Sequence, residues 1–482
     1  MKARHLLPAL ALLATAACTS EPEVPHPKNV LLLVVDTLRA DRLGCYGYGR
    51  ETSPNIDSLA ASGTLYENCY SQACWTVPSM ISMMSGVFVT QRETALPDGL
   101  IVLAEALHSR GLETAAFPAN PTLCLDRGFE RGYDHFIPIE KGAAPALSKK
   151  FAEWYQGKRA DEERRDKPFF AWAQFIDPHQ PYTPKAKHDI FRGALPEQGE
   201  LSKRWRAEQH RVEGLSPDLE SLSFADAAAK MNRESNLYDG EVHQADAGIG
   251  QILDLLRDSG ELEDTLVIIA SDHGEMLFEH PREPRLVQSC IEKEGGLPDG
   301  VKDLFGNGHR PWYYDNLWNT PLILSGPGIE AGVRRNGLAA NLDLFPTILE
   351  ALDLAPIPGL DGQSLFTGRE AERERIFAYG HLTPAVREAS GKKLFVHPRL
   401  LYMLEGEGPR PTKLYDLPTD PSELSELSAT SPEEVQRLQG LVDAWKAENK
   451  RDARTTTSAA QRKVLKDLGY IGTGLDFNAD DE

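Results

Sequence analysis

The sequence predicts an α/β fold: a large, doubly wound, mostly parallel β-sheet flanked by helices, followed by a smaller C-terminal α+β domain. Two unbroken apolar runs, Asn29 to Val35 and Thr265 to Ala270, suit strands that are buried on both faces, as in parallel sheets. Amphipathic helical patterns separate such runs, and strands alternating with helices are typical of a doubly wound sheet. The 482 residues suffice for one large unit and a smaller one.

The N-terminal segment has the pattern of an export signal. Two basic residues precede an apolar stretch, Leu6 to Ala17, which is too short to span a bilayer but suits a secretory signal. Small residues then lead to Cys18, which resembles the lipidated cysteine of a bacterial lipobox. We therefore expect residues 1–18 to be a signal peptide and residues 19–28 a tether. Lipidation of Cys18 predicts a periplasmic or outer-membrane lipoprotein of the cell envelope, whereas plain cleavage predicts a secreted protein.

The large domain is expected to span residues 29–369. Besides the two runs above, three segments are expected to be strands: Thr64 to Tyr70, Phe169 to Phe175 and Pro321 to Leu324. Three segments carry the apolar spacing of helices: Leu100 to Ser109, Tyr238 to Leu256 and Leu342 to Leu352. Two polar, charged stretches are expected to be surface loops: Gly193 to Arg233 and Pro281 to Phe305.

The C-terminal domain is expected to span residues 370–482, because the sequence pattern changes near Glu370. Two short segments there have the character of strands: Lys393 to Val396 and Leu400 to Leu404. Two helices are expected after them: Pro432 to Asn449 and Gln461 to Leu468.

Composition excludes some classes of partner. The formal net charge is -20, and no basic run with interleaved aromatic residues is present, so nucleic acid is not an expected partner. After the N-terminal segment no stretch is apolar enough to cross a membrane. Membrane contact is therefore expected only through an N-terminal lipid anchor.

Two acidic residues stand at the carboxyl ends of predicted buried strands, the edge at which open α/β sheets bind ligands. They are Asp36 and Asp272, and either one alone could instead cap the helix that follows it. Two such acids, with His273 directly after the second, form a mixed oxygen and nitrogen set that suits a divalent cation. The sequence therefore predicts a metal site.

Thr76 is a candidate nucleophile. It precedes Pro78, which favours the first turn of a helix, so Thr76 is expected at or just before the N-cap. One interpretation is a capping hydroxyl. The other is a hydroxyl at a helix N-terminus, where amide groups stabilise anions and a neighbouring cation lowers the pKa of the alcohol.

Two histidines are candidates for contact with the substrate. His179 follows a predicted buried strand, and His309 lies in a glycine-rich loop. Each alone is compatible with a structural or surface histidine. Together with the acids they could neutralise an oxyanion and protonate a leaving group, and the sequence does not choose between them for the second role.

Around these residues the chain resembles the sulfatase family of the alkaline phosphatase superfamily. NVLLLVVDTLRADRLGCYGY resembles that family's first strand and metal ligand, and TSPNIDSLAASGTLYENCYSQACWTVPS the approach to its nucleophile. FIDPHQPYTP resembles its substrate-histidine segment, SDHGE its second pair of metal ligands, and GNGHRPWYYDNLWNTPLILSGPG the following loop and strand. The resemblance continues through KLYDLPTDPSE. It implies a sulfatase-like fold, metal binding by Asp36, Asp272 and His273, and contact of His179 and His309 with the transferred group.

The chain departs from that family's pattern at the nucleophile. Active sulfatases usually carry C-x-P-S-R, whose cysteine becomes formylglycine, whereas this chain has Thr76 and Met80 at the first and last positions. No formylglycine is therefore expected. The family's usual Asp-Asp pair is Asp36-Thr37 here, and His273 stands where many members have Asn. One divalent ion is implied, with manganese or zinc favoured over calcium and Thr76 as a further ligand.

This departure bears on the substrate. A formylglycine hydrate can expel sulfate by breaking its own C–O bond, but a threonine sulfate cannot. A threonine phosphate can be cleared by a second in-line attack, so we expect a phosphodiester or phosphonate monoester, small or linked to a glycan or lipid. Three alternatives remain open: an arylsulfatase-type hydrolase, a phospholipid-headgroup transferase, and a catalytically inactive binding protein with this fold.

Overall fold

The computed structural model describes most of the chain. The described residues are 24–88, 95–97, 100–124, 127–140, 143–195, 198–212, 224–281, 305–309, 312–366, 373–380, 383–396 and 412–449. Four predicted features lie outside them: residues 1–18 with the lipidation site Cys18, the strand Leu400 to Leu404, the helix Gln461 to Leu468 and the domain boundary at 369/370. These stay predictions.

A mixed, mostly parallel sheet forms the centre of the molecule, as the sequence predicts. Its strand order is β10-β2-β9-β6-β1-β5-β3-β4. The central β1 pairs in parallel with β5 and β6, whereas β9 runs antiparallel to both of its neighbours. The bounds are β1 (Asn29–Val35), β2 (Thr64–Tyr70), β3 (Glu113–Pro118), β4 (His135–Phe136), β5 (Phe169–Phe175), β6 (Thr265–Ser271), β9 (Asn319–Ser325) and β10 (Val333–Ala340).

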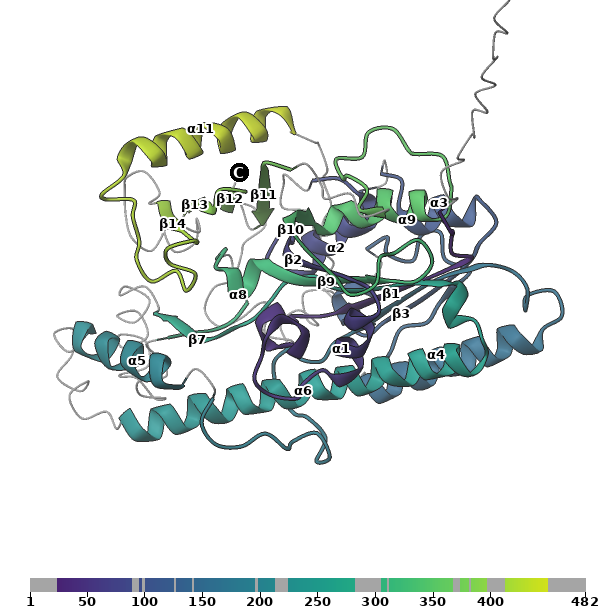
Figure 1. The fold of residues 1–482 in the computed structure, drawn as a ribbon, viewed down its shortest axis with the longest axis horizontal. Helices are drawn as coiled ribbons and strands as arrows, with labels where there is room; N and C mark the ends of the chain where they lie inside the picture. Colours follow the sequence, from purple (N-terminus) through teal and green to yellow (C-terminus); the bar gives the residue numbers. More distant parts are fainter. Residues whose placement is uncertain are drawn as a thin grey trace, which may run out of the picture.

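Helices cover both faces of this sheet (Figure 1). On one face lie α1 (Pro54–Ala61), α4 (Ala144–Ala160) and α6 (Phe224–Asp258), and on the other α2 (Thr76–Ser85), α3 (Leu103–His108) and α9 (Leu344–Ala351). Successive side chains of β1 enter the two cores alternately, because a strand points its side chains to opposite faces. This explains why β1 is apolar at every position.

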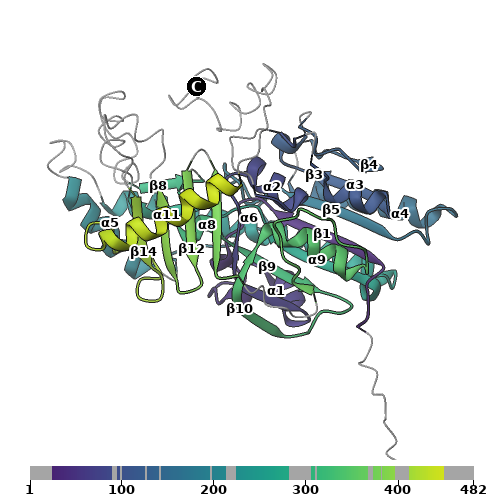
Figure 2. The same cartoon turned by 90° about the horizontal axis from the view of Figure 1, so that it is seen from above.

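A smaller antiparallel sheet lies beside the large one, with a helix across its strands (Figure 2). It consists of β11 (Arg375–Gly380), β12 (Thr383–Glu388), β13 (Lys392–Val396) and β14 (Thr412–Asp416), and α11 (Pro432–Glu448) packs on it. A two-stranded sheet, β7 (Met276–Pro281) with β8 (Phe305–Gly308), and the short α8 (Asp315–Trp318) lie near the carboxyl edge of β6. No helix of the described residues is long and apolar enough to cross a membrane.

The loop predicted from Gly193 to Arg233 is wrong in part. Helix α5 (Gln198–Val212) and the first turns of α6 occupy much of it. Leu201 and Trp205 are both buried and stand four residues apart on one face of α5. The indole Nε1 of Trp205 donates to the carbonyl oxygen of Phe278 at 2.9 Å. Two buried residues among many polar ones are too weak a periodic signal for a confident helix prediction. The second predicted loop begins in β7 and ends in β8, and residues 282–304 are outside the described part.

Candidate active site

The two strand-end acids lie side by side at one edge of the sheet. Asp36 follows β1 and Asp272 follows β6, and the parallel register pairs Val35 with Ser271 immediately before them. His273 adds a third side chain, and all three are completely buried. One ligand atom from each lies within 4.8 Å of the others. The register of two adjacent strands thus produces the cluster that the sequence predicts.

This cluster fits a divalent cation. Asp36 Oδ1 and Asp272 Oδ2 are buried and have no hydrogen-bond partner among the described residues. The His273 Nδ1 atom lies 2.9 Å from the carbonyl oxygen of Gly274, so Nδ1–H donates and the Nε2 lone pair is left for a metal. Nε2 lies 3.4 Å from Asp272 Oδ2 and 4.0 Å from Asp36 Oδ1. One possible ligand atom from each of the three side chains therefore lies near a common point.

Burial and mutual repulsion govern the protonation of the two acids. Removal from water raises the pKa of Asp36 well above its usual value, and the nearby Asp272 raises it further. Burial also raises the pKa of Asp272. Both carboxyls would bind a proton in the absence of a compensating positive charge, and a bound cation would supply that charge.

Two amide side chains that the sequence analysis missed hold Asp36 in place. The Nδ2 atom of Asn120 and the Nε2 atom of Gln174 donate to Asp36 Oδ2, at 2.6 and 3.0 Å. Gln174 also accepts hydrogen bonds from the backbone N–H groups of Ala119 and Asn120. The sequence contains a signal for both residues. Gln174 is the one polar residue in the strand FFAWAQF, and Asn120 stands two residues after the end of β3.

Thr76 lies at the cluster and does not cap its helix. It is the first residue of α2, the N-cap is Trp75, and no side-chain capping bond is present, so the capping interpretation is wrong. The Thr76 Oγ1 atom is buried, 3.3 Å from His273 Nε2 and 3.4 Å from Asn120 Nδ2. Ser79 on the next turn donates to the carbonyl oxygen of Asp272 at 2.6 Å, which fixes α2 against the end of β6.

Both predicted histidines lie next to the cluster. The ring centre of His309 is 4.5 Å from that of His273 and 4.8 Å from that of His179. His179 Nδ1 lies 2.6 Å from the carbonyl oxygen of Gln180, so Nδ1 carries the proton there. Burial lowers the pKa of His179 to about 4, and its ring is therefore neutral near pH 7.

Glu275 is a third residue that the sequence analysis did not single out. Its carboxyl group is completely buried, and Oε1 lies 3.5 Å from His309 Nδ1. Burial raises the pKa of Glu275 well above its usual value. The position could have been found from the sequence, because Glu275 ends the segment Ser271-Asp272-His273-Gly274-Glu275. His309 thus has a carboxyl partner, whereas His179 has a backbone carbonyl.

Helix α6 holds the segment that carries His179. Thr183 N–H donates to Glu241 Oε1 at 2.6 Å, and Lys185 N–H donates to Gln244 Oε1 at 2.9 Å. The Nε2 atom of Gln244 donates to Asp177 Oδ1 at 2.5 Å. Two side chains one helical turn apart therefore bind both ends of the segment from Asp177 to Lys185.

Comparison with known proteins adds four findings. The family model described as "Sulfatase" matches residues 28–354. Human arylsulfatase A is 25% identical over 518 residues, which cover 90% of each chain. A solved structure of a protein in complex with its substrate D-glucosamine-2-N,6-O-disulfate has a TM-score of 0.66 at 16% identity, covering 89% of this chain and 100% of the other. The phosphonate monoester hydrolase of Agrobacterium radiobacter has a TM-score of 0.65 at 19% identity, covering 88% and 96%.

Proposed function

This chain belongs to the sulfatase family and is an ester-bond hydrolase, and we propose that it uses a divalent cation and Thr76 to hydrolyse a phosphodiester or phosphonate monoester. The observation that carries the proposal is the position of Thr76. Its Oγ1 atom is buried, 3.3 Å from His273 Nε2, at the point where the unpaired oxygens of Asp36 and Asp272 converge. A buried hydroxyl beside three candidate metal ligands is in a position to serve as a nucleophile that a cation would activate.

The donor set favours manganese or zinc. Two carboxylates, one imidazole and one hydroxyl suit these ions, whereas calcium prefers six to eight oxygen ligands. Asp36, Asp272 and His273 would hold the ion, with Thr76 beside it. A divalent cation there lowers the pKa of the adjacent hydroxyl and polarises a non-bridging oxygen of the ester.

In the first half of the proposed reaction, Thr76, His179 and His309 have different roles. The Thr76 hydroxyl loses its proton to solvent, and Oγ1 attacks phosphorus in line with the leaving oxygen. A bond forms between Oγ1 and phosphorus as the bond from phosphorus to the leaving oxygen breaks. Nδ1 of His179 is committed to the carbonyl oxygen of Gln180, so its Nε2 can only accept a hydrogen bond while the ring is neutral. His309, with Glu275 behind it, is left to give its proton to the leaving oxygen.

In the second half of the proposed reaction, His309 accepts a proton instead of donating one. Water attacks phosphorus from the side of the departed group, His309 takes a proton from that water, and the bond between phosphorus and Thr76 Oγ1 breaks. A sulfate group on Thr76 lacks the C–O cleavage route that a formylglycine hydrate provides. Met80, at the position of the family's arginine in the modification motif, belongs to α2 and is buried in the apolar core. Both features support a phosphoryl substrate over a sulfuryl one.

A sulfate ester is the second candidate substrate. Curated relatives of this chain include arylsulfatase A and a choline-sulfatase, and one structural neighbour was solved with a disulfated glucosamine. For this substrate Thr76 would attack sulfur, and water would have to attack sulfur a second time. An anionic ester on a small molecule or a glycan is common to both candidates.

Activity of the purified protein on four esters separates these candidates. We expect bis(4-nitrophenyl) phosphate or a 4-nitrophenyl phosphonate monoester to be hydrolysed faster than 4-nitrophenyl phosphate or 4-nitrophenyl sulfate. Manganese or zinc should restore activity to chelator-treated protein better than calcium does. Fastest turnover of the sulfate ester would contradict the phosphoryl assignment, and full activity in chelator would contradict the metal.

A further inference from the structure

Gln180, the residue after His179, contacts the segments of both candidate catalytic histidines. Its backbone carbonyl oxygen accepts the hydrogen bond from Nδ1 of His179, at 2.6 Å. Its side-chain Nε2 atom donates to Oδ1 of Asn307 at 2.5 Å, and Asn307 stands two residues before His309. One residue therefore connects the segments of two imidazole rings whose centres are 4.8 Å apart.

A carboxylate of α6 determines the direction of the bond between Gln180 and Asn307. The Nδ2 atom of Asn307 donates to Oε2 of Glu234 at 2.8 Å. A carboxylate accepts hydrogen bonds and donates none, so Asn307 turns its amide nitrogen to Glu234 and its amide oxygen to Gln180. A hydrogen bond to a charged acceptor is also stronger than one between neutral groups. Glu234 thus fixes the orientation of both amide side chains.

The backbone just before His309 lies close to the same Gln180 side chain. Gly308 has a φ of +93°, a conformation that glycine adopts without strain. A Cβ atom at this position would lie only 3.2 Å from Oε1 of Gln180. The two ends of the Gln180 amide therefore face adjacent residues of β8, with Nε2 on Asn307 and Oε1 against Gly308.

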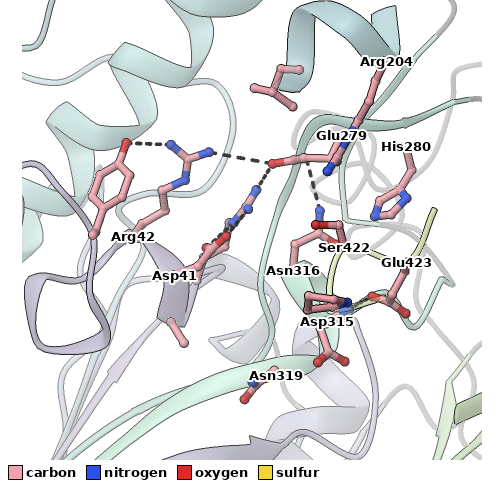
Figure 3. A pocket seen from close by; sticks show the side chains of 15 residues that line it. Asp41, Arg42, Arg204, Glu279, His280, Asp315, Asn316, Asn319, Ser422 and Glu423 are labelled. Carbon is pink, nitrogen blue, oxygen red and sulfur yellow. Dashed lines mark hydrogen bonds and ion pairs between the residues drawn. The ribbon is translucent and has the colours of Figure 1, made fainter. Parts of the chain in front are cut away.

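Strand β7 provides a stable base for β8, which it pairs with at Met276 and Leu277. Further along β7, Glu279 accepts hydrogen bonds from Nη1 of Arg39 at 2.5 Å and from Nδ2 of Asn316 at 3.1 Å. Figure 3 shows Glu279 and Asn316 joined in this way, in the wall of a cavity that both side chains line. Because β7 is held by these bonds, a contact that reaches β8 also fixes the histidine that follows β8.

We propose that Asn307, held by Glu234, is a positioning residue that acts through Gln180 to set the distance between the rings of His179 and His309. The inference rests on the proposed function, because it takes both rings to contact the transferred group. It holds equally for a phosphoryl and a sulfuryl group. A misplacement of about 1 Å can lower a catalytic rate roughly 10²-fold, so the bond should affect kcat more than KM.

Variants of Asn307 and Glu234 test the hydrogen bonds. Asn307→Leu keeps a similar size and removes both bonds, and we expect kcat to fall about 10²-fold while KM and bound metal change little. Asn307→Asp places two carboxylates against each other and should lose kcat in the same way. Adding Glu234→Gln to Asn307→Asp supplies an amide donor for the new carboxylate, which still accepts from Gln180. This double variant should regain most of the lost kcat.

The assays use the ester that the unaltered protein hydrolyses fastest. Asn336→Leu, which replaces an exposed amide on β10, is the matched control and should keep the kcat of the unaltered protein. Melting curves and metal analysis show which variants are folded and hold metal. Unchanged kcat in Asn307→Leu, or no recovery in the folded double variant, would overturn the proposal.

A crystal structure of Asn307→Leu gives a second measurement that needs no turnover. The separation of the His179 and His309 ring centres should increase from 4.8 Å, and an unchanged separation would refute the positioning role. Failure of the unaltered protein to hydrolyse any of the esters would instead refute the proposed function, and the ring separation would then decide the positioning role by itself.

Discussion

At the scale of single residues, the proposed metal site depends on Asp36, Asp272 and His273. We predict that Asp272→Ala abolishes both bound metal and activity, because it removes one of three converging donor atoms. Metal content by elemental analysis, with turnover measured on the same sample, checks the prediction. Asp443→Ala, at an exposed position of α11, is the matched control and should keep both. Full metal occupancy in Asp272→Ala would contradict the assignment of the three metal ligands.

The different partners of His309 and His179 predict different kinetic defects. His309→Ala should slow hydrolysis of an alkyl ester roughly 10²- to 10⁴-fold, because the alkoxide needs a proton to leave. It should slow a 4-nitrophenyl ester much less, because nitrophenolate leaves unprotonated. His179→Ala should slow both esters alike. Rates for the two esters with each variant provide the test, and equal losses in His309→Ala would assign the proton to another group.

Six candidate residues could be predicted from the sequence, and the structure brings all six together, because most of them directly follow apolar strands or stand in glycine-rich loops. The supporting groups have weaker signals in the sequence. Asn120, Gln174 and Glu275 act through side-chain hydrogen bonds and ion-pair contacts between segments far apart in the chain. Thr76 was ambiguous for a local reason, since a hydroxyl before a helical proline suits a cap equally well. The position of the N-cap at Trp75 resolves the ambiguity.

At the scale of elements, predicted strands match the structure better than predicted loops. The strands from Asn29 to Val35, Thr64 to Tyr70 and Phe169 to Phe175 have the predicted bounds. For the first and the third, burial on both faces leaves an almost continuous apolar run. Helix α6 extends fourteen residues further toward the N-terminus than the predicted start at Tyr238. Its first turns are polar and charged in sequence, so periodicity is weak there. Helix α5 was missed for the same reason.

The contact between α6 and the His179 segment predicts how stability depends on pH. Burial, with a contribution from the nearby Asp177, raises the pKa of Glu241 from its usual 4.5 to about 9. Its neutral form therefore stabilises the fold, and this contribution is lost as pH rises through about 9. Glu241→Gln keeps an acceptor for Thr183 N–H and has no charge to bury. Its melting temperature should exceed that of the unaltered protein by an amount that grows between about pH 5 and pH 9.

Melting temperatures across that range, for both proteins, provide the measurement. Glu433→Gln, in the first turn of α11 and exposed, is the matched control and should give no such trend. A constant difference between Glu241→Gln and the unaltered protein at all pH values would contradict the inferred protonation of Glu241.

At the scale of the whole molecule, the sheet and its two helical layers can be predicted from the sequence pattern. The antiparallel direction of β9 cannot. Pro321 to Leu324 has the same apolar character as its parallel neighbours, and burial on both faces conceals strand direction. In the smaller sheet, the structure confirms the strand predicted from Lys393 to Val396. This strand is β13, and it is one residue longer than predicted. Its packing with α11 makes the C-terminal region an α+β layer beside the large sheet.

Export is a property of the whole chain, and Cys18 carries the prediction. If Cys18 is lipidated, the mature protein should partition with membranes through its acyl chains, and Cys18→Ala should release or mislocalise it. Fractionation of cells, with mass spectrometry of the mature N-terminus, checks this. An unmodified N-terminus at Ala17 would show plain secretion instead.

The most direct test of the account concerns Thr76. A rapid-quench reaction with a phosphodiester should trap a phosphoryl group that mass spectrometry locates on Thr76. Thr76→Ala should lower turnover roughly 10³- to 10⁶-fold while metal content and fold persist, and Thr76→Ser should keep measurable activity. Loss of a mere helix cap would instead cost about 1 kcal/mol of stability and leave turnover nearly intact. A phosphothreonine at position 76 is the predicted result, and undiminished turnover by Thr76→Ala would contradict the account.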